Sequence, residues 1–169
     1  FIKCNPAIKT QADRAALLQG LRDGRLAVVA TDHAPHTLAE KGEKYFKAPS
    51  GLPLVQHALL MMLEHVHDGT LPLELVVEKT SHRVADLFGI RDRGYIREGY
   101  FADLVLVDHR RPTVVRREDV LSKCGWSPFE GDTFRSAIEM TIVNGTVAYE
   151  NGQVTEAVAG QRLVCGDRS

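Results

Sequence analysis

Apolar residues recur at helical spacing in three parts of the chain. Thr10 and Asp13 form a capping-box pattern ahead of the first of these parts. This part is predicted to form a helix that ends before Gly24. The second part predicts a helix over 54–67. The third predicts a helical pair over 73–79 and 81–88, with Ser81 as N-cap and Gly89 as the stop.

Strand patterns lie between and after these helices. The continuous apolar run 26–31 predicts a strand buried on both faces, as in a parallel sheet. Beyond residue 91, the apolar run 104–107 predicts a strand, and 138–149 predicts a hairpin that turns at Asn144-Gly145. The chain therefore reads as α/β up to about residue 90 and as a β-rich subdomain after it.

Composition narrows the function classes. Lys and Arg total 21 against 22 Asp and Glu, with no basic stretch, so nucleic acid is not an expected partner. The longest apolar window, 52–63, is shorter than the roughly 20 residues of a membrane span, and no signal peptide is visible.

Cys4, Cys124 and Cys165 lack paired spacing, which favours a reducing, cytoplasmic location. Cys4 has no activating neighbour for a nucleophile, and the other two are expected to pack.

The clearest candidate chemistry follows the predicted strand 26–31. The sequence Ala-Thr-Asp-His-Ala-Pro-His places Asp32 and His36 at its carboxyl end, where barrels of parallel strands carry catalytic groups. Asp32 is a candidate metal ligand or general acid/base, and His36 a candidate anion binder. The alternative is a plain turn in which the Asp32 side chain bonds its own backbone. The long loop 33–51 that follows favours a functional role.

A second histidine pair, His65-Val-His67, resembles a metal-binding motif of strands. On a strand, residues two apart share a face, whereas on a helix they lie about 200° apart. Because 54–67 is predicted to be helical, these residues are expected to be surface histidines that hold no metal.

Longer segments carry a family resemblance. Lys3-Cys4-Asn5-Pro6, ATDHAPHTLAEK (30–41), Ala48-Pro49-Ser50-Gly51 and ADLVLVD (102–108) together resemble the C-terminal part of the dihydroorotases, of the amidohydrolase superfamily. The resemblance implies a (β/α)8 barrel with a small β-sandwich subdomain. Residues 1–90 would be the C-terminal part of the barrel and 91–169 the sandwich. A full barrel takes roughly 250 residues, so we expect a C-terminal fragment.

The resemblance also implies an activity and a set of site residues. The activity is zinc-dependent interconversion of N-carbamoyl-L-aspartate and dihydroorotate in pyrimidine synthesis, with two zinc ions in the complete subunit. Asp32 would bind zinc and carry the proton, and His36 would bind the substrate α-carboxylate. Asn5, Ser50 and Gly51 would contact the substrate ring. Just after Asn5, Ala-Ile-Lys stands where the family has Pro-Leu-Arg, which puts a cationic role for Lys9 in doubt.

Two alternatives stay open. One is a related cyclic amidase, namely a hydantoinase, dihydropyrimidinase or allantoinase, against which His36 argues. The other is a non-catalytic dihydroorotase-like scaffold that associates with aspartate transcarbamoylase. The expected partners are a small-molecule substrate and either a second copy of the subunit or aspartate transcarbamoylase. Because most zinc ligands of the family would lie upstream of Phe1, the chain alone is expected to be inactive.

Overall fold

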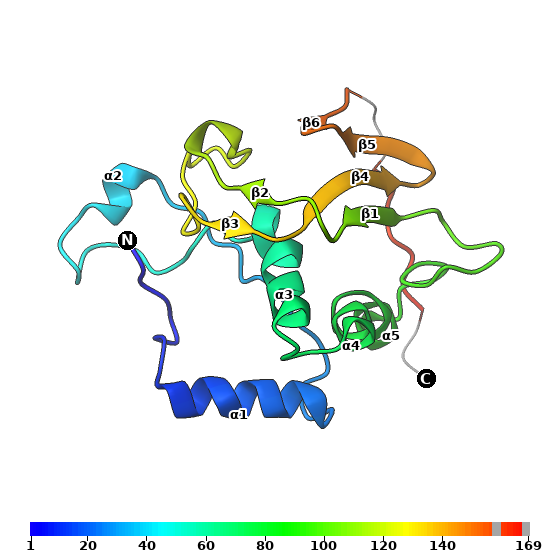
Figure 1. Cartoon of the computed structure of the whole chain (residues 1–169), viewed down its shortest axis with the longest axis horizontal. Helices are drawn as coiled ribbons and strands as arrows, with labels where there is room; N and C mark the ends of the chain where they lie inside the picture. The colour runs from blue at the N-terminus through cyan, green and yellow to red at the C-terminus, as the bar shows by residue number, and fades with distance from the viewer. Residues whose placement is uncertain (157–159, 167–169) are drawn as a thin grey trace.

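Helices occupy the first half of the chain and strands the second (Figure 1). The computed structural model describes residues 1–156 and 160–166. The helices are α1 Gln11–Arg22, α2 Leu38–Lys41, α3 Ala58–His67, α4 Leu73–Val77 and α5 Arg83–Phe88. A 3₁₀ turn, Val55–His57, leads into α3, a π-helical segment, Glu78–His82, joins α4 to α5, and a further 3₁₀ turn covers Arg117–Asp119.

Local signals explain where α1 and α3 form. Thr10 accepts from the amide of Asp13 while the Asp13 carboxylate accepts from the Thr10 amide, a complete capping box that confirms the predicted start of α1. The predicted helix over 54–67 is also confirmed, with its first turn tightened to 3₁₀ geometry.

The predicted break at Ser81 is wrong. Helical backbone continues from residue 73 to 88 through the π-helical segment, and the Ser81 hydroxyl donates to the Gly94 carbonyl at 3.0 Å instead of capping. Gly89 ends the run as predicted, with a left-handed φ of 62°.

The predicted strand 26–31 is not formed. Among the described residues, its backbone bonds to other segments are limited to those from Leu26 to the Gly20 carbonyl and from Val29 to the Lys79 carbonyl. Several of its residues are exposed. The physical reason is that the described residues provide no parallel strand beside it. Pairing is limited to one isolated parallel bridge, between His33 and Leu52.

The strands form two antiparallel sheets. The larger has the order β1-β4-β5-β6, and the smaller pairs β2 with β3. Their bounds are β1 Leu104–Asp108, β2 Thr113–Val114, β3 Thr133–Phe134, β4 Ala137–Val143, β5 Thr146–Glu150 and β6 Gln153–Val154. The predicted hairpin is confirmed: Asn144 and Gly145 both have positive φ, 51° and 78°, as a two-residue turn requires.

Helix α3 joins the two halves of the molecule. Its Leu60 packs with Val115 and Phe134 of the β-rich part. Its Met62 packs with Leu71 and with Val76 of α4. In Figure 1, α3 lies between α1 and the β2–β3 sheet. One helix thus contributes to both hydrophobic clusters.

Two smaller observations complete the fold. Cys165, expected to pack, is exposed, and all three cysteines are free thiols. Across residues 1–156 and 160–166, the longest apolar helix is too short to span a membrane.

Candidate active site

The segment around Asp32 runs alongside the end of the long loop. His33 forms the parallel bridge with Leu52, and the Ala34 amide donates to the Leu52 carbonyl at 3.0 Å. The His33 Nδ1 accepts from the amides of Leu54 and Val55 at 3.0 and 3.1 Å. His33 therefore holds the loop against the start of the 3₁₀ turn.

Asp32 adopts a backbone conformation that is uncommon for a residue with a side chain. Its φ is 47°, in the left-handed region. The side chain is exposed, and among the described residues its carboxylate has no hydrogen-bond or ion-pair partner. The turn in which Asp32 bonds its own backbone is therefore not formed. Instead, the His33 amide donates to the Thr31 hydroxyl at 3.2 Å.

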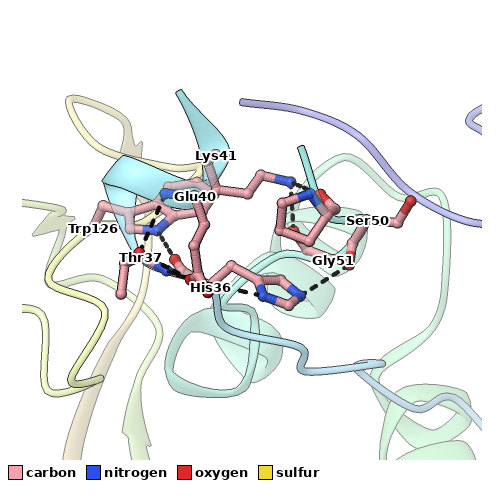
Figure 2. Close-up of polar contacts among 8 residues, drawn as sticks. His36, Thr37, Glu40, Lys41, Ser50, Gly51 and Trp126 are labelled. Atoms are coloured by element: carbon pink, nitrogen blue, oxygen red, sulfur yellow. Dashed lines mark hydrogen bonds and ion pairs between the residues drawn. The ribbon is translucent and has the colours of Figure 1, made fainter. Parts of the chain in front are cut away.

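His36 and Ser50 meet across the long loop (Figure 2). The His36 Nε2 lies 3.1 Å from the Ser50 carbonyl oxygen, and its Nδ1 lies 4.0 Å from a Glu40 carboxylate oxygen. Because a carbonyl only accepts, Nε2 carries the hydrogen in this contact. Nδ1 is then the ring nitrogen left for a ligand.

Helix α2 positions Glu40 beside His36. Thr37 and Glu40 form a second capping box, in which the Glu40 carboxylate accepts from the Thr37 amide and hydroxyl at 2.8 Å each. These donors, the Thr37 amide first, hold the pKa of Glu40 below its usual value. Sequence periodicity misses α2 because it has only four residues. The Thr-x-x-Glu spacing was the available signal.

Gly51 is the one loop position where a side chain would not fit. Its φ is 131°, and a Cβ would lie 2.6 Å from both the Cβ and the carbonyl oxygen of Ala34. Its amide donates to the Lys3 carbonyl at 2.8 Å. Glycine therefore allows the loop to approach the segment after Asp32 closely.

The first residues of the chain lie against the same loop. Lys3 Nζ donates to the Tyr45 carbonyl at 2.6 Å and to the Ala48 carbonyl at 2.5 Å. Asn5, two residues further on, is exposed, and the Asn5-Pro6 peptide bond is cis. The structure thus brings the segment that carries Asn5 to the loop that carries Ser50 and Gly51.

Two residues that the sequence did not single out complete the loop. Lys41 is buried, and its Nζ donates to the carbonyls of Pro49 and Gly51 at 2.9 and 3.0 Å. The Trp126 indole N–H donates to the His36 carbonyl at 2.7 Å. Trp126 lies ninety residues after His36, and no local pattern connects the two.

The described residues do not form a metal site by themselves. In the ranges 1–156 and 160–166, no three His, Cys, Asp or Glu side chains come together as ligands. Protein zinc sites take three or four such ligands. Asp32 could therefore supply only one of the ligands that such a site needs.

His65 and His67 both lie on α3, as predicted, and so do not share one face as they would on a strand. His67 differs from the expected surface histidine. It is half-buried, and its Nε2 lies 2.8 Å from the hydroxyl of Ser136, which is fully buried.

A cavity lies beside the segment that precedes Asp32. Its volume is about 690 Å³, and its lining is mainly apolar, from residues 29–31, α3, α4 and β1. Asp32, His36, Ser50 and Gly51 do not line it. The polar groups and the backbone geometry, rather than this cavity, define the candidate site.

The chain belongs to the amidohydrolase family, whose model matches residues 4–148. It is 43% identical over 163 residues to a dihydroorotase of Halobacterium salinarum, and 37% identical over 154 residues to a dihydroorotase of Latilactobacillus sakei. These matches cover 96% and 90% of this chain but 38% and 36% of the relatives. The chain thus spans little more than a third of the curated relatives it matches.

Solved structures agree with the family. The L-hydantoinase (dihydropyrimidinase) of Arthrobacter aurescens superposes with a TM-score of 0.85 at 32% identity, over 90% of this chain and 35% of that one. The dihydropyrimidinase of Brevibacillus agri gives a TM-score of 0.81 at 27% identity, over 90% and 34%. The arrangement of helices and antiparallel sheet is therefore that of a part of the amidohydrolase fold.

Proposed function

We propose that this chain is the part of a zinc-dependent dihydroorotase that carries one zinc ligand and a wall of the substrate site. The reaction would be the reversible interconversion of N-carbamoyl-L-aspartate and (S)-dihydroorotate. The observation that carries the proposal is that His36 and the Ser50–Gly51 loop meet in a chain 43% identical to a dihydroorotase. Residues 1–90 would belong to a (β/α)8 barrel and 91–169 to a β-sandwich subdomain.

Asp32 is proposed as the residue that moves the proton. An exposed carboxylate with no partner among the described residues is ready to accept a proton from the water that attacks the ring carbonyl. As the carbon–nitrogen bond breaks, the same proton passes to the departing ring nitrogen. The left-handed backbone at Asp32 supports this role, because such conformations cluster at functional sites.

His36 is proposed to bind the substrate α-carboxylate through Nδ1. With Nε2–H bonded to the Ser50 carbonyl, a protonated ring still offers Nδ1–H as a charge-assisted donor. The Glu40 carboxylate, 4.0 Å from Nδ1, would be displaced from that contact by the substrate. Asn5 and the backbone amides at Ser50 and Gly51 are proposed to contact the ring.

A cyclic amidase of the hydantoinase class is the second candidate. The superposition on the Arthrobacter aurescens L-hydantoinase favours it. His36 argues for the first candidate, because a hydantoin ring carries no α-carboxylate for it to bind. A non-catalytic scaffold that binds aspartate transcarbamoylase, a homodimer and a cytoplasmic location also remain proposals.

A chimaera tests the function directly. This chain would replace the matching 36% of the Latilactobacillus sakei dihydroorotase, and the product would be assayed with dihydroorotate, hydantoin and dihydrouracil. We expect hydrolysis of dihydroorotate well above that of the other two. Preference for hydantoin or dihydrouracil would support the second candidate. A folded chimaera that binds zinc but hydrolyses none of the three substrates would support the non-catalytic scaffold.

A further inference from the structure

The hydrogen bond between His36 and Ser50 is fixed at both ends by buried donors (Figure 2). Lys41, 4% exposed, bonds the carbonyls of Pro49 and Gly51, one on each side of Ser50. Trp126, also 4% exposed, bonds the backbone carbonyl of His36. Lys41 therefore holds the segment that carries the Ser50 carbonyl acceptor. Trp126 holds the backbone of His36, whose ring donates to that carbonyl.

The charge on Lys41 is not explained by an ion pair. Its two hydrogen bonds go to neutral carbonyls, and among the described residues it has no carboxylate partner. A buried ammonium without a counter-charge is unfavourable for stability. What it provides is up to three N–H donors and no acceptor, which suits the orientation of several carbonyls of one loop.

The position of the Ser50 carbonyl decides which tautomer His36 adopts. A neutral imidazole has one N–H and one lone pair, and the bond made by one nitrogen fixes the state of the other. With the Ser50 carbonyl 3.1 Å from Nε2, the hydrogen stays on Nε2 and the lone pair on Nδ1. If that carbonyl moved away, both tautomers would become populated.

We propose that Lys41 and Trp126 are positioning residues that keep the His36 Nε2–H on the Ser50 carbonyl, so that Nδ1 is the nitrogen that takes up the second proton and donates to the substrate carboxylate. The part of this proposal that concerns the substrate carboxylate rests on the proposed function. The part that concerns the His36–Ser50 contact is independent of it. The β-rich half would thus take part in the site through Trp126, which follows β2 and precedes β3.

Nuclear magnetic resonance of the 169-residue chain tests this proposal without substrate. Ring nitrogen shifts would be recorded at pH about 8, above the ordinary imidazole pKa of about 6.5, and His36 assigned by its loss in His36→Gln. We expect separate protonated and unprotonated nitrogen signals in the unmodified chain. Lys41→Met should average them, and should speed exchange of the Gly51 amide at least tenfold.

Two further variants make the result decisive. Lys44→Met removes an exposed lysine of the same loop and should change neither the His36 shifts nor Gly51 exchange. Trp126→Phe keeps a ring but removes the N–H, and should also average the His36 signals. If Lys41→Met does not fold, Trp126→Phe decides. Unchanged His36 shifts in folded Trp126→Phe, or in folded Lys41→Met, overturn the proposal.

Dihydroorotate titration separates this inference from the proposed function. In the chimaera, Lys41→Met should raise KM for dihydroorotate about tenfold while kcat stays within about twofold. If the unmodified chimaera has no activity but the shifts respond as expected, the proposed function fails and the positioning of His36 stands.

Discussion

Gly51 and His57 show how single residues constrain the fold. Gly51 has a φ of 131°, and a Cβ on it would lie 2.6 Å from the Cβ of Ala34. His57, at the start of α3, is 5% exposed, stacks on Phe134 and lies 3.3 Å from the Ser127 hydroxyl. Burial lowers the pKa of His57, because the charged ring loses its hydration.

Replacement of Gly51 by alanine should destabilise the chain by about 1–3 kcal/mol, from backbone strain and the clash with Ala34. Gly125→Ala is the matched control, since Gly125 has a φ of 69° but open space around it, and should cost only about 1 kcal/mol. Urea unfolding measures both. Equal losses would mean that the close approach at Gly51 does not matter.

The buried His57 predicts a pH dependence of stability. Its pKa in the folded chain lies below the unfolded value of about 6.5, so the unfolded state binds more protons. Its destabilising effect is absent above that unfolded pKa and grows as the pH falls below it, by at most about 1.4 kcal/mol per pH unit. Unfolding followed from pH 7.5 to 5 should show this slope, and His57→Phe should remove it. An unchanged slope in His57→Phe would contradict the assignment.

At the scale of elements, α3 is tied to the strands by polar as well as apolar contacts. Arg135, just before β4, bonds the Glu64 carboxylate at 2.7 Å and the Asp68 carboxylate at 2.6 Å. These pairs are largely exposed and contribute little. The hydrogen bond of His67 to the buried Ser136 is the better candidate for a stabilising contact.

Ser136→Ala should therefore cost about 1–3 kcal/mol, because it leaves the half-buried His67 ring without its partner. Ser122→Ala serves as control and should cost less than about 0.5 kcal/mol. Within the described part of the chain, the Ser122 hydroxyl accepts only from the weak thiol donor of Cys124, at 3.3 Å. Thermal unfolding compares the two variants. Similar losses would show that the His67 contact does not stabilise the junction.

The elements predictable from sequence were those with local causes. Helix α1 follows from its capping box, and the β4–β5 hairpin from Asn144-Gly145. The strand predicted over 26–31 needed a neighbouring parallel strand, which the described residues do not supply. At the site, Lys41 and Trp126 act through contacts to the loops, and Trp126 depends on a tertiary contact that no local pattern encodes.

The molecule as a whole covers little more than a third of the dihydroorotases it matches. Among the described residues it brings no three metal-ligating side chains together. We therefore expect the 169-residue chain alone to retain no stoichiometric zinc after dialysis and to hydrolyse no dihydroorotate. Metal analysis and a hydrolysis assay check this. One retained zinc per chain would contradict it.

The roles of Asp32 and His36 are tested together by kinetics of the chimaera with dihydroorotate. Asp32→Ala should lower kcat by roughly 10²–10⁴, as expected for loss of a general acid/base. His36→Ala should raise KM about ten- to hundredfold, as expected for loss of a charge-assisted bond to the substrate carboxylate. Near-normal kcat in Asp32→Ala, or an unchanged KM in His36→Ala, would contradict the account.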